Sequence, residues 1–213
     1  MKLRMKRKAM VVLAAGMLMS AAAPAAAMAA EKATGPALTA SYNGDVNTLE
    51  AAKDATQLIE VIGNRQDPAK SRLDWYKRDA DGKLVQVMSK EAVSGMNGIT
   101  MQKQEGDKKT PAGVYRFTMA FGLKANPDHQ IVDGDYYVDD GNSQYYNKLE
   151  NTKQVQKDWN SAENLMAQAP QYNYGLVLDY NPECTPGKGS AIFLHCPKSW
   201  NNTGTSGCIS IPE

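Results

Sequence analysis

Short β-prone runs, separated by turn residues, recur along this chain from residue 57 onward. Each run has the length of one strand and ends at glycine, proline, asparagine or aspartate. The predicted strands cover residues 57–63, 114–121, 172–180, 190–196 and 208–211, and a predicted hairpin covers 73–87 with its turn at 79–82. The runs do not alternate with long helical segments, as strands do in sheets built from βαβ units. The sequence therefore predicts a mainly β fold with minor α content, of the mixed β-sandwich type.

Two helices are expected beside these strands. Asn47 followed by Glu50 is similar to a capping box, which predicts a short helix over residues 48–56. A second helix is predicted over residues 152–168, because apolar side chains recur there at helical spacing. The apolar positions are Val155, Trp159, Ala162 and Met166. We expect their stripe to pack against the core.

A polar stretch between residues 122 and 151 contains two tyrosine pairs and several aspartates. Aspartates spaced as in Asp133 and Asp135 can bind calcium, but the full twelve-residue ligand loop is missing. We therefore expect a solvated insertion rather than a calcium site.

The amino terminus has the pattern of an export signal. Five basic side chains lie within the first eight residues, and an apolar segment rich in alanine and methionine follows to residue 30. Ala27 and Ala29 supply the small residues that signal peptidase requires, so we expect residues 1–29, the leader, to be removed after Ala29. The alternative is an uncleaved membrane anchor, since the apolar run approaches the ~20 residues that span a bilayer. In both cases the domain is extracytoplasmic, in the cell wall, the periplasm or the medium.

Charge and histidine content exclude several function classes. The leader carries five of the 24 basic residues and none of the 23 acidic ones, so the mature chain is net acidic. No basic patch remains that could dominate nucleic-acid binding. His129 and His195 are the two histidines, and neither has the spacing of a metal ligand. We expect no metal, no cofactor and no nucleic-acid partner.

The rest of the chain divides into two parts. Residues 30–56 form a small, polar lead-in that ends in the short helix, and residues 57–213 form one catalytic domain. Ser210, Pro212 and Glu213 together match the start of a helix. We therefore expect the domain to continue beyond the end of this sequence.

The candidate site lies in residues 189–212. His195 ends an apolar run that has the composition of a buried strand, and Cys208 follows Gly207 in a glycine-containing loop. A loop that folds back would bring the imidazole to the thiol and convert it to a thiolate nucleophile. The alternative is structural, because cysteine is commonly buried and a lone histidine is often only hydrogen-bonded.

Three cysteines leave at least one thiol unpaired in an exported protein. Cys208 is the expected free thiol. A disulfide between Cys184 and Cys196 is possible if their α-carbons lie within ~7 Å of each other. A buried, reduced Cys196 is the favoured alternative.

The segment Thr205-Ser206-Gly207-Cys208-Ile209, placed after a strand-end histidine, resembles the signature of the L,D-transpeptidase family of cell-wall enzymes. Residues 110–115, Thr-Pro-Ala-Gly-Val-Tyr, resemble a second segment of that family, and the similarity extends over residues 57–213. Two positions depart from the pattern. Most members have a histidine at the position of Ser206 and an arginine at the position of Ser210. The resemblance implies a β-sandwich-like domain with an open cleft.

The resemblance also implies roles for individual residues. Cys208 is the expected nucleophile and His195 the expected general base. Backbone N–H groups of Gly207 and Cys208 are the natural donors to an oxyanion. No carboxylate in the motif can orient the imidazole, so we expect the backbone carbonyl of Cys196 to fix its tautomer. The expected substrate-binding positions are Thr205, Ser206 and Ser210.

The implied substrate is a peptidoglycan stem peptide. Cys208 would attack the carbonyl that joins an L-configured centre to D-alanine, release D-alanine and form a thioester. Transfer to an acceptor amine gives an L,D cross-link. Two alternatives remain: an L,D-carboxypeptidase, in which water resolves the thioester, and a non-catalytic wall-binding protein, which the serine at 206 suggests.

Overall fold

The computed structural model describes residues 9–14, 44–124, 127–198 and 203–213. These residues form strands arranged in three sheets, with three short 3-10 helices, so the prediction of a mainly β fold is confirmed. The helices are η1 (Val46–Thr48), η2 (Glu50–Ala52) and η3 (Met166–Gln168). The strands are β1 (Ala9–Ala14), β2 (Gln57–Gly63), β3 (Lys70–Arg78), β4 (Leu84–Val93), β5 (Ile99–Thr100), β6 (Thr110–Pro111), β7 (Gly113–Gly122), β8 (His129–Gln130), β9 (Asp135–Val138), β10 (Leu149–Asn151), β11 (Ala162–Asn164), β12 (Gly175–Leu178), β13 (Phe193–His195) and β14 (Ile209–Ser210).

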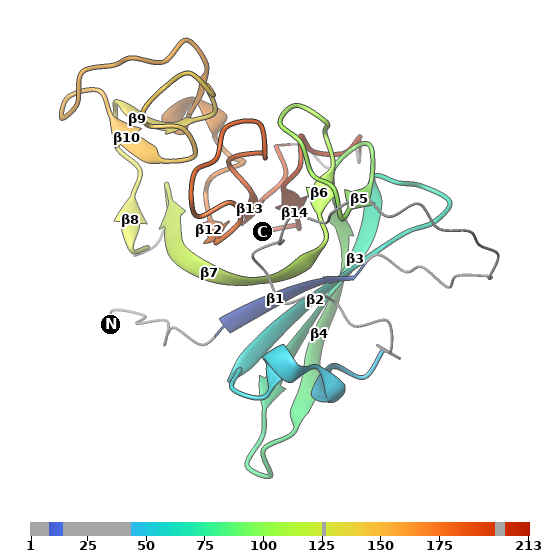
Figure 1. The fold of residues 1–213 in the computed structure, drawn as a ribbon. Coiled ribbons are helices and arrows are strands. Elements are labelled where there is room, and N and C mark those ends of the chain that lie inside the picture. Colours follow the sequence, from blue (N-terminus) through green and yellow to red (C-terminus); the bar gives the residue numbers. More distant parts are fainter. Residues whose placement is uncertain (1–8, 15–43, 125–126, 199–202) are drawn as a thin grey trace.

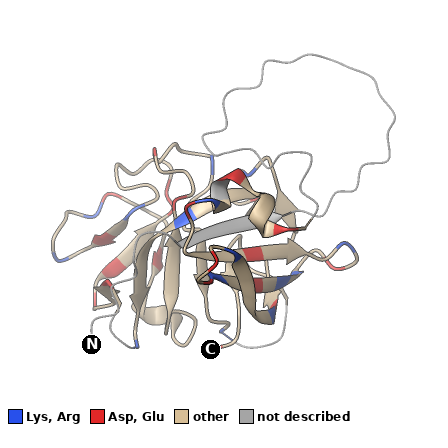
Figure 2. Ribbon diagram, turned by 90° about the horizontal axis from the view of Figure 1, so that it is seen from below, with Lys and Arg blue, Asp and Glu red and all other residues tan. Residues whose placement is uncertain are grey.

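The largest sheet has the strand order β1-β2-β3-β4-β14-β13-β12-β7-β8. β14 is the junction of its two halves, because it pairs antiparallel with β4 and parallel with β13. Figure 1 shows the long hairpin of β3 and β4 at the bottom of the view and the small sheet of β9 and β10 at the top left, with β12, β13 and β14 between them. Figure 2 shows basic and acidic positions interspersed along the ribbon.

The predicted hairpin over residues 73–87 is present and longer than expected, since β3 and β4 pair from Lys70 to Val93. Its turn forms because the Asp79 side chain accepts hydrogen bonds from the N–H groups of Asp81 and Lys83 at 3.0 and 2.8 Å. Gly82 has a φ of +79°, a conformation that glycine adopts without strain.

Both predicted helices are wrong. Asn47 does not cap a helix over 48–56, because its side chain pairs with the backbone of Leu84 at 2.8 and 3.1 Å, and the segment forms only the 3-10 turns η1 and η2. Residues 152–168 contain strand β11, which pairs with β9, and only the single turn η3. Trp159 is buried there but Met166 is 38% exposed, so the apolar positions do not form one buried face.

The stretch 122–151 is not a solvated insertion. It contributes β9 and β10 to a three-stranded sheet with β11. Asp135 is buried on β9, where it accepts hydrogen bonds from Asn151 and from the backbone N–H of Val132 and lies 2.8 Å from His129 Nε2. The buried carboxylate is thus compensated by hydrogen bonds inside the fold. Within the described ranges, no cluster of three or more acidic, histidine or cysteine side chains could hold a metal.

Part of the predicted leader is described. The backbone of β1 pairs parallel with β2 and antiparallel with β7. The expected cleavage position and most of the lead-in, up to residue 43, lie outside the described residues. Of the residues that the structure describes, none belongs to a helix long and apolar enough to cross a membrane.

Removal of residues 1–29 should expose the strand edges that β1 covers. In a chain that begins at Ala30, amides of residues 57–63 and 113–116 should exchange with deuterium faster than in the full-length chain, because they lose the partner strand. Amides of β12 and β13, which are not paired with β1, serve as the internal control. If the amides of β2 and β7 exchanged equally slowly in the full-length and the shortened chain, the prediction would be contradicted.

Candidate active site

The pairing of β13 with β14 brings the predicted site residues together. The two strands are parallel, with Leu194 beside Ile209 and His195 beside Ser210. Leu194 and Ile209 belong to one buried cluster, whereas Phe193 and Cys208 belong to another. Since side chains alternate along a strand, His195, Ser210 and Cys208 share one face of the sheet.

These three side chains line one cleft with a volume of about 350 Å³. Glu163 of β11, in the small sheet, and Tyr172, which precedes β12, line it as well. Another hollow, of about 370 Å³ against β2, β3 and β4, has no histidine or cysteine in its wall. The first cleft is therefore the candidate active site.

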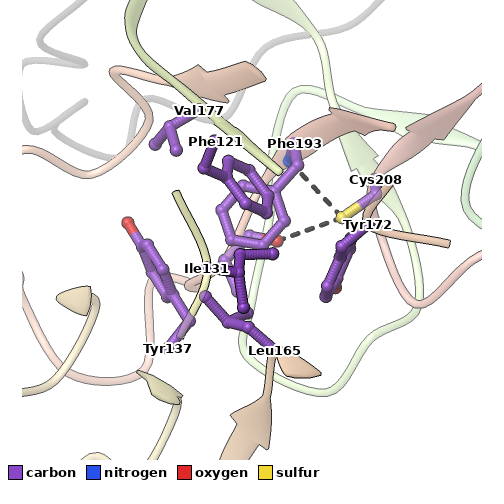
Figure 3. Close-up of a cluster of buried hydrophobic side chains, with 9 residues drawn as sticks. Phe121, Ile131, Tyr137, Leu165, Tyr172, Val177, Phe193 and Cys208 are labelled. Carbon is purple, nitrogen blue, oxygen red and sulfur yellow. Dashed lines mark hydrogen bonds between the residues drawn. The ribbon is translucent and has the colours of Figure 1, made fainter. Parts of the chain in front are cut away.

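Cys208 lies at the edge of an aromatic cluster (Figure 3). Its thiol donates a hydrogen bond to the Ala191 carbonyl at 3.1 Å, and its sulfur accepts one from the Phe193 N–H at 3.4 Å. Burial raises the pKa of the Cys208 thiol strongly, and the nearby Glu163 carboxylate raises it further. The Phe193 hydrogen bond and Lys103 act in the opposite direction and do not offset these effects. Burial therefore favours the neutral thiol over the expected thiolate in the resting protein.

His195 is fixed by one hydrogen bond. Its Nδ1 lies 2.6 Å from the carbonyl oxygen of Cys196. Because a carbonyl can only accept, Nδ1 carries the hydrogen and Nε2 has the free lone pair. Burial lowers the pKa of His195 to about 4, although the bond to Cys196 raises it. The imidazole is thus a neutral base at neutral pH, and no hydrogen bond in the described part of the chain joins it to Cys208.

Two threonine hydroxyls hold the turn that carries Cys208. Thr205 Oγ1 donates to the Cys208 carbonyl at 2.6 Å, and Thr110 Oγ1 donates to the same oxygen at 3.3 Å. Thr205 Oγ1 also accepts from the Gly207 N–H at 3.1 Å. A side chain at Gly207, where φ is +148°, would come within 3.0 Å of the Lys109 carbonyl. The threonine of the 110–115 segment therefore supports the turn that carries Cys208 directly.

The remaining predicted residues have different environments. Ser206 is exposed at the wall of the cleft. The Thr205 hydroxyl, expected to bind substrate, is engaged within the turn, as is the Gly207 N–H. Cys184 and Cys196 are free thiols, and Cys196 is buried with its sulfur 3.9 Å from the Tyr174 carbonyl oxygen.

Sequence reasoning missed Glu163 and Tyr172. The Tyr172 hydroxyl donates a hydrogen bond to Glu163 Oε2, and the Tyr172 ring meets the His195 ring edge-on with centroids 5.4 Å apart. A lone glutamate within a predicted helix carried no signal for a site. Its position depends on the pairing of β11 with β9, which local sequence does not reveal.

The His195 environment predicts a loss of stability in acid. Because the folded pKa of about 4 lies below the unfolded value of 6.5, the unfolded chain binds the proton more tightly between these pH values. The free energy of unfolding should therefore fall as the pH drops from 6.5 toward 4, by on the order of 3 kcal/mol from this group.

Urea unfolding at pH 7 and pH 4 measures the effect, with His195→Gln as the matched variant. The wild type should lose more stability than the variant over this interval. An equal loss in both proteins would show that His195 titrates normally in the folded state.

Ser210 offers a hydroxyl to the cleft. It is 3% exposed, and its Oγ has no hydrogen-bond partner within the described part of the chain. Ser210→Ala should therefore not lower the melting temperature, while KM for a peptide substrate should rise about fivefold if the substrate supplies the missing partner.

Ser71 on β3 provides the control, because its buried hydroxyl also lacks a partner among the described residues and lies outside the cleft. Ser71→Ala should leave both the melting temperature and KM unchanged. A destabilised Ser210→Ala protein, or equal KM values for both variants, would contradict the assignment.

Comparison with known proteins identifies the family of the chain. The sequence model of one family, described as the L,D-transpeptidase catalytic domain (YkuD), matches residues 66–213, which is more than half of the chain. No curated protein matches the chain, and no solved structure does. The matched region contains β3 to β14 and thus every residue named in the cleft. The chain belongs to the L,D-transpeptidase catalytic domain family, whose members act on peptidoglycan.

Proposed function

We propose that this protein is an exported cysteine transpeptidase that forms L,D cross-links between peptidoglycan stem peptides. Membership of the family supports the reaction class. The observation that carries the assignment is the shared face of β13 and β14, from which His195 and Cys208 line one cleft. Cys208 is the nucleophile, His195 is the general base, and the reaction uses no cofactor.

The first half-reaction transfers the stem-peptide acyl group to sulfur. As Cys208 Sγ attacks the carbonyl carbon, its proton passes to His195 Nε2. The bond from this carbon to the nitrogen of D-alanine breaks, and His195 returns the proton to that nitrogen. The Cys196 carbonyl stabilises the transient imidazolium by accepting a hydrogen bond from Nδ1–H. In the resting structure its oxygen lies 2.6 Å from His195 Nδ1.

The neutral resting pair determines when the proton moves. The thiol pKa is raised and the His195 pKa is lowered to about 4, so the thiolate–imidazolium pair is unfavourable before substrate binds. Proton transfer therefore accompanies attack on the carbonyl rather than preceding it. The thiol must also exchange its hydrogen bond to the Ala191 carbonyl for one to His195.

The Cys208 and Gly207 N–H groups are our proposed donors to the oxyanion. In the resting structure the Gly207 N–H donates to Thr205 Oγ1. An oxyanion would share or replace this acceptor as the tetrahedral intermediate forms. Ser206 and Ser210 supply hydroxyls to the bound peptide, and Thr205 contributes by holding the turn.

The proposed location of the enzyme is inferred from the amino-terminal leader. We propose that residues 1–29 direct export and are removed, so that the enzyme works in the cell wall or periplasm, where its substrate is. An uncleaved leader would instead retain the domain at the membrane.

Intact-protein mass spectrometry tests the nucleophile. A stem tetrapeptide ending in D-alanine, or a carbapenem, should add one acyl group to the wild type and none to Cys208→Ala. Cys184→Ala and Cys196→Ala should label normally; Cys184 is partly exposed and so tests for nonspecific thiol reaction. His195→Gln should slow acylation about 10²–10⁴-fold, the usual contribution of a general base.

The products separate the alternatives. Cross-linked dimer identifies a transpeptidase, whereas shortened peptide alone identifies an L,D-carboxypeptidase. Labelling that persists in Cys208→Ala would overturn the assignment of the nucleophile. Peptide binding by a folded wild type without any acylation would favour the non-catalytic wall-binding role.

A further inference from the structure

Glu163 places a carboxylate in the same cleft as the nucleophile. It lies at the centre of β11, beside Tyr137 of β9, and keeps part of its surface open to the cleft. Among the described residues, the Tyr172 hydroxyl donates a hydrogen bond to the Glu163 carboxylate, and the Tyr172 ring packs against His195. Glu163 therefore lines the same cleft as the reacting groups, from the small sheet.

The surroundings of this carboxylate are acidic. None of the ion pairs among the described residues involves Glu163. Burial raises the pKa of Glu163, the hydrogen bond from Tyr172 lowers it in part, and the nearby charge of Asp139 raises it as well. The buried Oδ1 of Asp139 has no hydrogen-bond partner within the described ranges. Two acidic groups thus lie close together without a cation from the described part of the chain, an arrangement that a positively charged ligand would stabilise.

The second half-reaction brings such a ligand to the thioester. An acceptor amine is an ammonium ion at neutral pH, and it must lose a proton before its nitrogen can attack. His195 has returned its proton to D-alanine by then, so the imidazole can take only one further proton. A second acceptor for the proton of the incoming ammonium therefore assists this step.

We propose that Glu163 binds the ammonium group of the acceptor peptide and accepts its first proton, so that this residue selects cross-linking over hydrolysis. This inference rests on the proposed function, because it requires a thioester at Cys208. The ammonium gives one proton to the Glu163 carboxylate, and the neutral nitrogen attacks the thioester carbonyl. A C–N bond forms, the C–S bond breaks, and the second proton passes through His195 to the Cys208 sulfur. The products are the amide, a neutral thiol and a protonated Glu163.

A purely structural role would need only an acceptor for the Tyr172 hydroxyl. Glutamine at 163 retains that acceptor and the shape of the side chain but removes the charge and the ability to take a proton. It also removes a negative charge that raises the pKa of Cys208, so the rate of acylation is measured separately from the fate of the thioester. Glu163→Gln therefore separates the two roles.

The experiment uses the full chain with a stem tetrapeptide ending in D-alanine as donor. The acceptor is either a lysine-containing peptide, whose amine is cationic, or hydroxylamine, which is uncharged at neutral pH. For each acceptor the ratio of transfer product to hydrolysis product is measured. This ratio is formed only by molecules that have been acylated, so a lower stability of a variant does not alter it.

In Glu163→Gln the ratio for the lysine peptide should fall about tenfold or more, while the ratio for hydroxylamine should stay within about twofold of the wild type. Glu163→Asp, which keeps the charge, should retain more transfer to the lysine peptide than Glu163→Gln. Glu183→Gln is the matched control, because Glu183 is exposed and outside the cleft, and it should change neither ratio.

Two results would overturn the inference while leaving the proposed function intact. One is an unchanged ratio for the lysine peptide in Glu163→Gln. The other is an equal fall for both acceptors, which would show that the substitution disturbs the thioester site in general. Absence of any acyl-enzyme in the wild type is a different outcome, because it would refute the proposed function itself and the inference with it.

Discussion

The parallel pairing of β13 with β14 is the interaction on which the candidate site depends. It is short, yet its register sets Ser210 beside His195 and keeps Cys208 on the same face. β14 is joined to the hairpin half through the pairing of Ser210 with Val93, and the hydroxyls of Thr110 and Thr205 tie down the Cys208 carbonyl. A shift of one residue would turn Cys208 away from the cleft. Precise register therefore matters more here than the number of paired residues.

Burial acts on the two reacting groups in opposite senses. It raises the pKa of the Cys208 thiol and lowers that of the His195 imidazole, and both effects favour the neutral form. The resting site is consequently an uncharged acid beside an uncharged base. A neutral thiol reacts slowly with electrophiles in solution. It is activated only when bound substrate supplies a compensating charge or a developing oxyanion. The dry environment that suppresses the thiolate also strengthens any hydrogen bond to the oxyanion once it forms.

The sequence predicted well those features that local pattern determines. Residues 57–63 form the expected strand, the turn at 79–82 closes the expected hairpin, and the mainly β class follows from such runs. Prediction from the sequence failed where contacts with residues far away in the chain determine the local structure. Asn47 is a residue type that commonly caps helices, but its side chain forms hydrogen bonds with the backbone of Leu84 instead. The contribution of Glu163 to the cleft likewise depends on strand pairing between β11 and β9, and no spacing within residues 152–168 could indicate it.

The two departures from the family pattern acquire a physical meaning in this cleft. With serine at 206 and at 210, the positions where most members have histidine and arginine contribute only neutral hydroxyls. Among the described residues that line the cleft, Lys198 is then the one cationic side chain, and it is exposed. Glu163 is buried enough for its charge to act on Cys208, whereas an exposed lysine is screened by water. Glu163 raises the pKa of Cys208 more than Lys103 lowers it, so the charge near the sulfur favours a cationic group of a bound peptide. Ser210, buried and without a partner among the described residues, can then contact the peptide by hydrogen bonding without adding charge.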